Sequence, residues 1–261
     1  MEFLAGIRID SLSLLGSIKV INMYQNVILE PISPQLKLSL NIENVDCLFP
    51  GFMLGDFAVL HGSSSIQSLL SSLCVRAQLP YQLGGLETNV LFVDGSNSFR
   101  LYDVSAIAQS FELDPKEVLE RIFVSRAFTA YQLVSLVFEQ LQSVVKKYNS
   151  KVVILSNLAQ LFLDNDVPKK EAQEVFLQLT AYLSKFAKRN RVILVATQPP
   201  RFWSKRSRFF KEVLCGRANV VASVRKFKHR TYFVLEKHPV FKLGKAEFPS
   251  DEATLADFME A

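Results

Sequence analysis

Residues 57–70 have the layout of a phosphate-binding loop but lack its reactive side chains. An apolar stretch leads through the small residues 62–65 into an apolar helix, which is the order in which such loops are built. Their chemistry requires glycines that let backbone N–H groups surround the phosphates, a lysine for the β/γ charge and a hydroxyl for magnesium. No Lys or Arg lies between Ala58 and Val75. The pattern therefore predicts the layout without the phosphoryl-transfer chemistry.

A second stretch, residues 199–211, combines basic with aromatic side chains. Cations can neutralise successive phosphates while rings stack on bases, as in proteins that bind single strands with little sequence preference. The region from Arg201 to Lys237 holds eleven basic and two acidic residues, a balance of +9, whereas the whole chain carries +5. We interpret residues 199–211 as a nucleic-acid-binding segment. The predicted DNA-binding residues are Arg201, Phe202, Trp203, Lys205, Arg206, Arg208, Phe209, Lys211, Lys228 and Arg230.

The elements that must position these residues alternate between strands and helices, which predicts an α/β fold with a mostly parallel sheet covered on both faces. A C-terminal β-hairpin is expected from residues 219–226 and 231–237. Residues 1–47 read as a small β-rich N-terminal segment, with strands near 18–28 and 36–42, before a core of residues 48–261. The core strands are expected at 57–60, 90–94, 122–125, 151–156 and 191–197, with helices at 65–78, 101–111, 115–121, 130–148 and 169–188.

Composition restricts the class of protein. A chain of 261 residues with 49% hydrophobic content can bury one large core. The three cysteines are scattered and odd in number, which favours neither a disulfide framework nor a zinc site. The histidines show no ligand spacing, so we expect no metal. There is no signal-peptide pattern and no apolar run of membrane-spanning length, so we expect a cytoplasmic protein without membrane association.

Five segments follow one another in a fixed order along the chain. They are AQLP at 77–80, VLFVDGSNSFR at 90–100, LDPKEVLERIFVSRAFT at 113–129, VILVATQ at 192–198, and the basic hairpin together with KAEF at 245–248. The third is the most specific, because it combines a helix-starting Asp-Pro with Arg-Ala-Phe at a fixed distance. Together they resemble RecA/RadA-type recombinases, in particular archaeal RadA. The resemblance implies a RecA-like ATPase core over roughly residues 48–250 and a DNA-binding loop at residues 199–211, after the strand that ends at Gln198.

The resemblance also implies that the nucleotide site is degenerate. Counting back without gaps from residues 77–80 places Ser65, Ile66 and Gln67 at the Gly, Lys and hydroxyl positions of Walker A. In the turn after the second core strand, the family's catalytic glutamate falls on Ser96, and the aspartate that ends the Walker B strand falls on Ser156. Each of the missing groups would supply several kcal/mol of electrostatic stabilisation. We therefore expect no catalytic residue and no ATP hydrolysis. The vestigial site would consist of Gly62, Ser63, Ser64, Ser65, Ile66, Gln67, Asp94, Ser96, Ser156 and Gln198.

No bound cofactor is expected there, although ATP binding stays possible. In one interpretation, serines 63–65 simply cap the following helix, since serine is a favoured N-cap. In another, free N–H groups at the helix start bind an anion or a nucleotide without turnover.

The leading hypothesis is a non-catalytic RadA-like paralogue that acts in DNA repair or homologous recombination. It would bind single-stranded DNA, assist a RadA-like recombinase or another paralogue, or do both. One alternative is an interaction scaffold without DNA affinity, whose basic face meets an acidic protein. In that case, Trp203, Phe209 and Phe210 could pack the loop against the core. A further alternative is an ATP-binding protein with an atypical nucleotide site that depends on Asp94.

Overall fold

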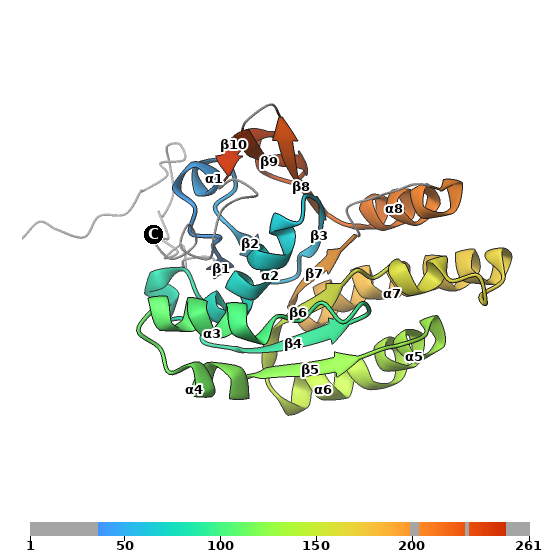
Figure 1. Ribbon diagram of the computed structural model, residues 1–261, viewed down its shortest axis with the longest axis horizontal. Coiled ribbons are helices and arrows are strands. Elements are labelled where there is room, and N and C mark those ends of the chain that lie inside the picture. Colours follow the sequence, from blue (N-terminus) through green and yellow to red (C-terminus); the bar gives the residue numbers. More distant parts are fainter. Residues whose placement is uncertain (1–35, 199–203, 228–229, 249–261) are drawn as a thin grey trace, which may run out of the picture. The chain divides into compact units, whose positions relative to one another are not determined.

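The computed structural model describes residues 36–198, 204–227 and 230–248, and its main element is an eight-stranded sheet (Figure 1). The strand order is β10-β9-β8-β3-β7-β6-β4-β5. Pairing is parallel from β8 to β5 and antiparallel for β9 and β10. The predicted α/β class is confirmed. The strands are β3 (Phe57–Gly62), β4 (Asn89–Asp94), β5 (Ile122–Arg126), β6 (Ser150–Ser156), β7 (Ile193–Thr197), β8 (Val220–Phe227), β9 (Arg230–Lys237) and β10 (Gly244–Phe248).

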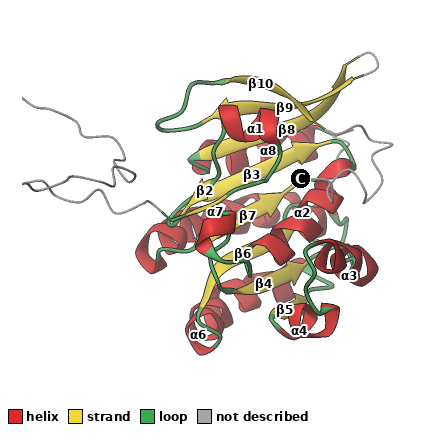
Figure 2. Ribbon diagram, turned by 90° about the vertical axis from the view of Figure 1, so that its left-hand side faces the viewer, coloured by secondary structure: helices red, strands yellow, loops and turns green. Residues whose placement is uncertain are grey.

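Helices cover both faces of this sheet (Figure 2). Strand residues alternate between the faces, so Ala58 and Leu60 belong to one buried cluster and Phe57 and Val59 to the other. No helix within the described ranges is both long and apolar enough to cross a membrane. The first cluster is covered by α1 (Glu43–Leu48), α2 (Ser65–Arg76), α3 (Leu101–Ser110) and α4 (Pro115–Glu120), and the second by α5 (Ala130–Ser135), α6 (Leu141–Lys147), α7 (Lys169–Asn190) and α8 (Lys205–Arg217).

The start of helix α4 has a clear chemical cause, and the helix expected after it is interrupted. The Asp114 side chain accepts a hydrogen bond from the Lys116 N–H (2.9 Å) and Pro115 occupies the first helical position, so α4 begins where Asp-Pro predicts. The helix expected over residues 130–148 is present, but a π-helical segment at Leu136–Gln140 separates α5 from α6. Two short 3₁₀ segments, Tyr81–Leu83 and Gln160–Leu163, follow α2 and β6.

The N-terminal part departs from the prediction. Of the strand expected near 36–42, only β1 (Lys37–Leu38) is present, and it pairs antiparallel with β2 (Phe52–Met53) in a separate two-stranded sheet. Helix α1 lies between β1 and β2 in the sequence and runs across the predicted boundary between residues 47 and 48. The strand expected at 18–28 lies outside the described residues, and the domain division stays a prediction.

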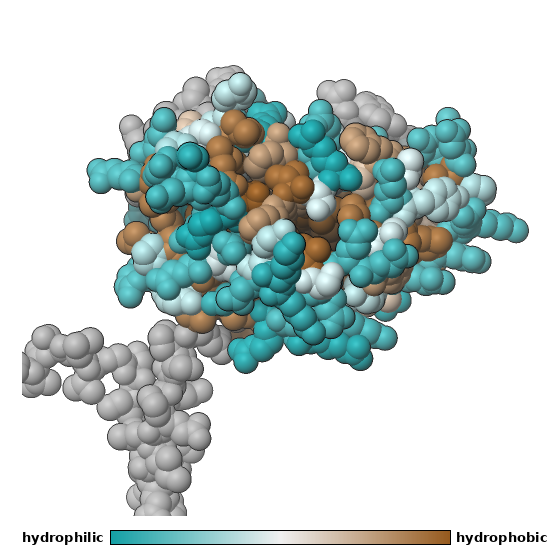
Figure 3. All heavy atoms as spheres, turned by 90° about the horizontal axis from the view of Figure 1, so that it is seen from below, coloured by the Kyte–Doolittle hydropathy of each residue, from teal (hydrophilic) through white to brown (hydrophobic). Residues whose placement is uncertain are grey.

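Strand β5 ends the sheet and pairs with β4 alone among the described strands. Figure 3 views this side and shows apolar side chains gathered at its centre. A groove of about 30 Å³ lies between β5 and the π-helical segment, lined in part by Leu91, Phe123 and Leu136. The Phe123 ring stacks on Tyr148 with centroids 3.6 Å apart. The groove is far smaller than usual ligand pockets, so the candidate site lies elsewhere.

The turn after β3 requires glycine at position 62. Its backbone angle φ is +120°, which residues with a side chain rarely adopt. A Cβ at this position would lie 2.1 Å from the Val224 carbonyl oxygen on β8. The backbone of β3 can therefore approach β8 closely just before the chain enters α2.

Gly62→Ala should lower the free energy of unfolding by about 2 kcal/mol or more, because it combines backbone strain with a clash. Urea denaturation measures this. Gly216→Ala in α8 is a matched control, since a Cβ there meets nothing within 4 Å. It should leave stability unchanged or raise it by up to about 1 kcal/mol. Equal destabilisation by both substitutions would contradict this account of the turn.

Candidate functional site

A cavity of about 410 Å³, lined mainly by residues with polar side chains, lies where the parallel strands β3, β4, β6 and β7 end. In open α/β sheets, ligands bind outside the carboxyl ends of the strands. The cavity brings together six of the predicted site residues, Ser63, Ser64, Ile66, Gln67, Ser96 and Gln198. It adds five that the sequence did not single out, Asn97, Ser98, Arg100, Asn157 and Thr197. The predicted residues Gly62, Ser65, Asp94 and Ser156 are not among its lining.

The turn at the start of α2 is closed by hydrogen bonds within the chain. The Ser63 N–H donates to the Val224 carbonyl (2.8 Å), and the Ser65 N–H donates to the Ser63 hydroxyl (3.2 Å). The N–H groups of Ile66 and Gln67 donate to the carbonyls of Ser63 (3.3 Å) and Ser64 (2.9 Å). Four amides of the phosphate-loop position thus already have acceptors. The Ser63 hydroxyl is one of them, whereas Ser64, the N-cap residue of α2, makes no side-chain capping bond.

The residues at the lysine and hydroxyl positions of this turn serve the protein interior. Ile66 is buried in the cluster beneath α2, although its edge reaches the cavity. The Gln67 Nε2 donates to the Ser98 carbonyl (2.7 Å), which ties α2 to the turn after β4. Neither side chain carries a charge that could stabilise a phosphate.

Asp94 is almost fully buried and organises the turn between β4 and α3. Its Oδ1 accepts hydrogen bonds from the N–H groups of Ser96 (3.2 Å) and Ser98 (2.9 Å) and from the Ser98 hydroxyl (3.0 Å). Its Oδ2 accepts from the Phe99 N–H (3.0 Å). Both carboxylate oxygens therefore face the protein's own donors, and Asp94 has a structural role in this turn.

Hydroxyl and amide groups connect the remaining strand ends. The hydroxyls of Ser98 and Ser156 are hydrogen-bonded to each other, and the Asn157 Nδ2 donates to the Ser96 hydroxyl (2.7 Å). The Asn157 N–H donates to the Thr197 hydroxyl (2.8 Å). No group of three or more potential metal ligands occurs in the described part of the chain. Ser156, at the Walker B position, therefore offers a hydroxyl that is already bonded within the chain.

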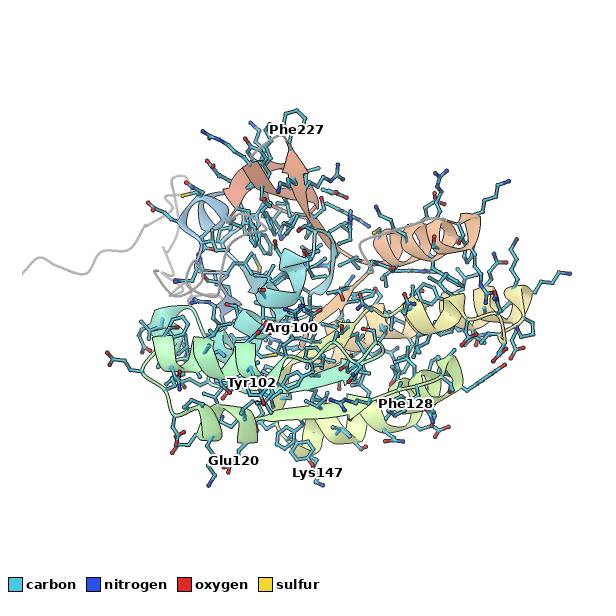
Figure 4. The ribbon with its side chains drawn as sticks, in the orientation of Figure 1. Arg100, Tyr102, Glu120, Phe128, Lys147 and Phe227 are labelled. Atoms are coloured by element: carbon cyan, nitrogen blue, oxygen red, sulfur yellow. The ribbon has the colours of Figure 1, made fainter. Side chains whose placement is uncertain are left out.

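Gln198 and Arg100 are the cavity residues best placed to meet a bound molecule. The Gln198 side chain is 2% exposed, lines the cavity and has no hydrogen-bond partner among the described residues for either its nitrogen or its oxygen. Arg100, marked in Figure 4, is the charged residue of the lining. Its side chain is 56% exposed, and its guanidinium lies 3.5 Å from the Asp103 carboxylate. The cavity offers one partly paired cation and several neutral donors.

A partly buried charged network beside this turn has no local signal in the sequence. The His61 Nε2 lies 3.1 Å from a Glu236 carboxylate oxygen, and Ser223 donates to the other oxygen (2.6 Å), which also pairs with Arg225. Burial by itself would raise the pKa of Glu236. Hydrogen bonds with His61 and Ser223 and the charges of His61 and Arg225 outweigh it and lower this pKa to about 2. The network joins β3 to β8 and β9.

The predicted DNA-binding loop is mostly a helix, which corrects the loop interpretation. Helix α8 begins at Lys205, and Ser204 and Ser207 form a reciprocal capping box at its start. Lys205 and Arg208 are exposed, whereas Arg206, Phe209 and Lys211 are partly buried. Arg230 is exposed on β9 and pairs with Glu247 at 3.3 Å. The other predicted DNA-binding residues, Arg201, Phe202, Trp203 and Lys228, lie outside the described residues.

The aromatic residues of α8 pack inward. Phe210 is fully buried, and its ring centroid lies 4.7 Å from that of Phe176 and 6.0 Å from that of Phe162. Phe209 is partly buried against the same cluster. Phe210 therefore cannot stack on a base, as the packing alternative expects, and Phe209 offers only part of its ring.

Comparison with known proteins places the site within a family. Residues 44–199 match the protein-family model described as Rad51. A stretch of 111 residues is 33% identical to the "DNA repair and recombination protein RadA" of Metallosphaera sedula. This match covers 42% of the present chain and 32% of that relative, so the chain spans about a third of the length of RadA.

Asp94→Asn should lower the free energy of unfolding by about 2–3 kcal/mol, because an amide nitrogen would face backbone donors that now reach a buried carboxylate. Urea denaturation measures this, with Asp103→Asn in the first turn of α3 as the control. A loss no larger than that of the control would contradict the structural role.

Glu236 should contribute to the acid limb of stability. Because its folded-state pKa is lowered to about 2, its contribution is present above the unfolded pKa and is lost as the pH falls through the folded value. Glu236→Gln should reduce stability near neutrality by about 2 kcal/mol and flatten the decline below about pH 5. Thermal unfolding at several pH values measures this, and an unaltered acid limb would be inconsistent with it.

Proposed function

Because this chain belongs to the Rad51 family, we propose that it acts in DNA repair or homologous recombination as a non-catalytic member of that family. It binds single-stranded DNA, assists a RadA-like recombinase or another paralogue, or does both. A cytoplasmic location is part of the same proposal.

The observation that carries the non-catalytic assignment is the closed turn at the start of α2. Nucleotide hydrolases need open amides, a lysine and magnesium ligands at this place. Here four amides have acceptors within the chain, Ile66 fills the lysine position, and Ser156 bonds to Ser98 where an aspartate would hold the metal. These replacements support degenerate Walker motifs, because they remove separate requirements of the same reaction.

The DNA-binding part of the proposal is supported by the first turns of α8. Lys205 and Arg208 are exposed there, and no ion-pair partner within 4.0 Å is found for either in the described part of the chain. On the hairpin, in contrast, Arg225 pairs with Glu236 and Arg230 with Glu247. The cations of α8 can therefore neutralise phosphates without first breaking an ion pair.

The ion pairs of the hairpin favour a second candidate, an interaction scaffold without DNA affinity. Neutralised arginines contribute little to phosphate binding but can order a protein interface. A pulldown from nuclease-treated extract separates the two functions, since a partner that is bridged by DNA would be lost.

Magnesium-ATP should not bind measurably at millimolar concentration, and no phosphate release should be detected. Calorimetric titration and a phosphate-release assay on the same sample test this, with a known recombinase as the positive control. Turnover abolished by Asp94→Asn without loss of folding would instead support the atypical nucleotide site.

Replacing both Lys205 and Arg208 by Gln should weaken binding to single-stranded DNA and lower the slope of log affinity against log salt by about 1.4, or about 0.7 for each phosphate that is no longer neutralised. Fluorescence anisotropy over a range of salt concentrations measures the slope. Lys146→Gln with Lys147→Gln is the charge-matched control, because both residues are exposed in the last turn of α6, and Lys147 lies away from α8 at the lower edge of Figure 4. Equal losses in both variants would argue for unspecific charge attraction.

A further inference from the structure

Arg206 differs from the basic residues on either side of it. Lys205 and Arg208 face solvent, but Arg206 is partly buried, and its Nη2 donates to the Val167 carbonyl (2.9 Å). Its Nε is buried and has no partner among the described residues. The guanidinium is thus directed toward the protein, away from the face on which a phosphate backbone would lie.

The acceptor belongs to the turn that precedes α7. The Val167 side chain is buried, and its N–H donates to the Asp164 carbonyl (3.4 Å). The Asp166 N–H donates to the Asp164 carboxylate (3.2 Å), so the turn also has local bonds of its own. Through Arg206, the first turn of α8 is joined to residues 164–167, and the Val167 acceptor comes 39 positions earlier in the chain.

One helical turn further on, Phe210 fixes α8 a second time. Residues four apart share a helix face, so Arg206 and Phe210 point to the same side. Phe210 packs between Phe162, which lies just before the turn, and Phe176 on α7. The hydrogen bond from Arg206 to the Val167 carbonyl and the packing of Phe210 against Phe162 and Phe176 therefore hold the start of α8.

We propose that Arg206 is a positioning residue for DNA binding. It holds the first turn of α8 against residues 164–167, so that Lys205 and Arg208 present their charges from a fixed helix, and it does not itself contact phosphate. This inference rests on the proposed function, and it separates Arg206 from the DNA-contacting residues with which the sequence groups it.

Salt dependence distinguishes a positioning residue from a phosphate-binding one. Arg206→Gln and Arg208→Gln each remove one charge from the same helix. Arg208→Gln should lower the salt slope of single-stranded DNA binding by about 0.7. Arg206→Gln should lower affinity by up to about tenfold with an unchanged slope, because a positioning bond to a charged group is removed. A fall in slope as large as that of Arg208→Gln would overturn the inference.

Hydrogen exchange supplies a readout that does not need DNA. Amides of residues 164–168 should exchange faster in Arg206→Gln and at the wild-type rate in Arg208→Gln. Unchanged exchange in Arg206→Gln would also overturn the inference. If the wild-type protein binds no single-stranded DNA, the DNA-binding part of the proposed function fails, and the positioning role in DNA binding fails with it. Wild-type binding with equal slopes in both variants rejects the inference alone.

Arg206→Lys covers the case in which Arg206→Gln does not fold. It keeps the charge but lacks the planar fork of the guanidinium. A phosphate-binding role would survive this change with little loss of affinity. A positioning residue would not be replaced, so affinity should fall and exchange in residues 164–168 should rise. Full retention of both properties would contradict the positioning role.

Discussion

The buried carboxylate of Asp94 is the interaction on which the candidate site depends. It accepts four hydrogen bonds from the turn between β4 and α3. Ser98 of this turn is also hydrogen-bonded to the side chains of Gln67 and Ser156. Where parallel strands end side by side, the polar groups of several turns converge, and leaving them unpaired is costly. In this chain, side chains and neighbouring carbonyls supply the partners that a bound phosphate and its metal would otherwise provide. Apart from Arg100 and the Gln198 side chain, the polar groups of these turns described above are therefore bonded within the chain without a ligand.

The basic region is a helix because one of its faces packs against the protein core. Arg206, Phe210 and Leu214 follow each other at intervals of four, and the two hydrophobic side chains of this stripe are buried against α7 and its neighbours. That stripe fixes α8, and its opposite side carries Lys205 and Arg208. A rigid cationic helix binds phosphate with less loss of conformational entropy than a loop that must be ordered first. Its affinity then depends on charge and position more than on aromatic stacking.

How far the sequence predicts this structure depends on the range of the interactions involved. Buried parallel strands are apolar runs that can be recognised locally, so β4 and β6 appear close to where they are expected. The role of Asp94 needs the conformation of the following turn, and the bond between His61 and Glu236 spans 175 residues, so neither leaves a local pattern. Helix α8 did carry a local signal, the spacing of Arg206, Phe210 and Leu214, but the resemblance to recombinases implied a DNA-binding loop at this place.

Ligand binding at the cavity and at helix α8 therefore differs in its free-energy cost. Binding at the cavity would have to break internal hydrogen bonds one by one, because the donors of the turn are already engaged. Binding at α8 adds phosphate charge to exposed cations and releases counterions, a gain that needs no rearrangement of the protein. For the same chain, the free-energy cost of accepting a nucleotide is thus high, while the cost of accepting a polyanion is low. Under the proposed function, this difference, more than the absence of any single catalytic residue, would separate nucleic-acid binding from nucleotide turnover.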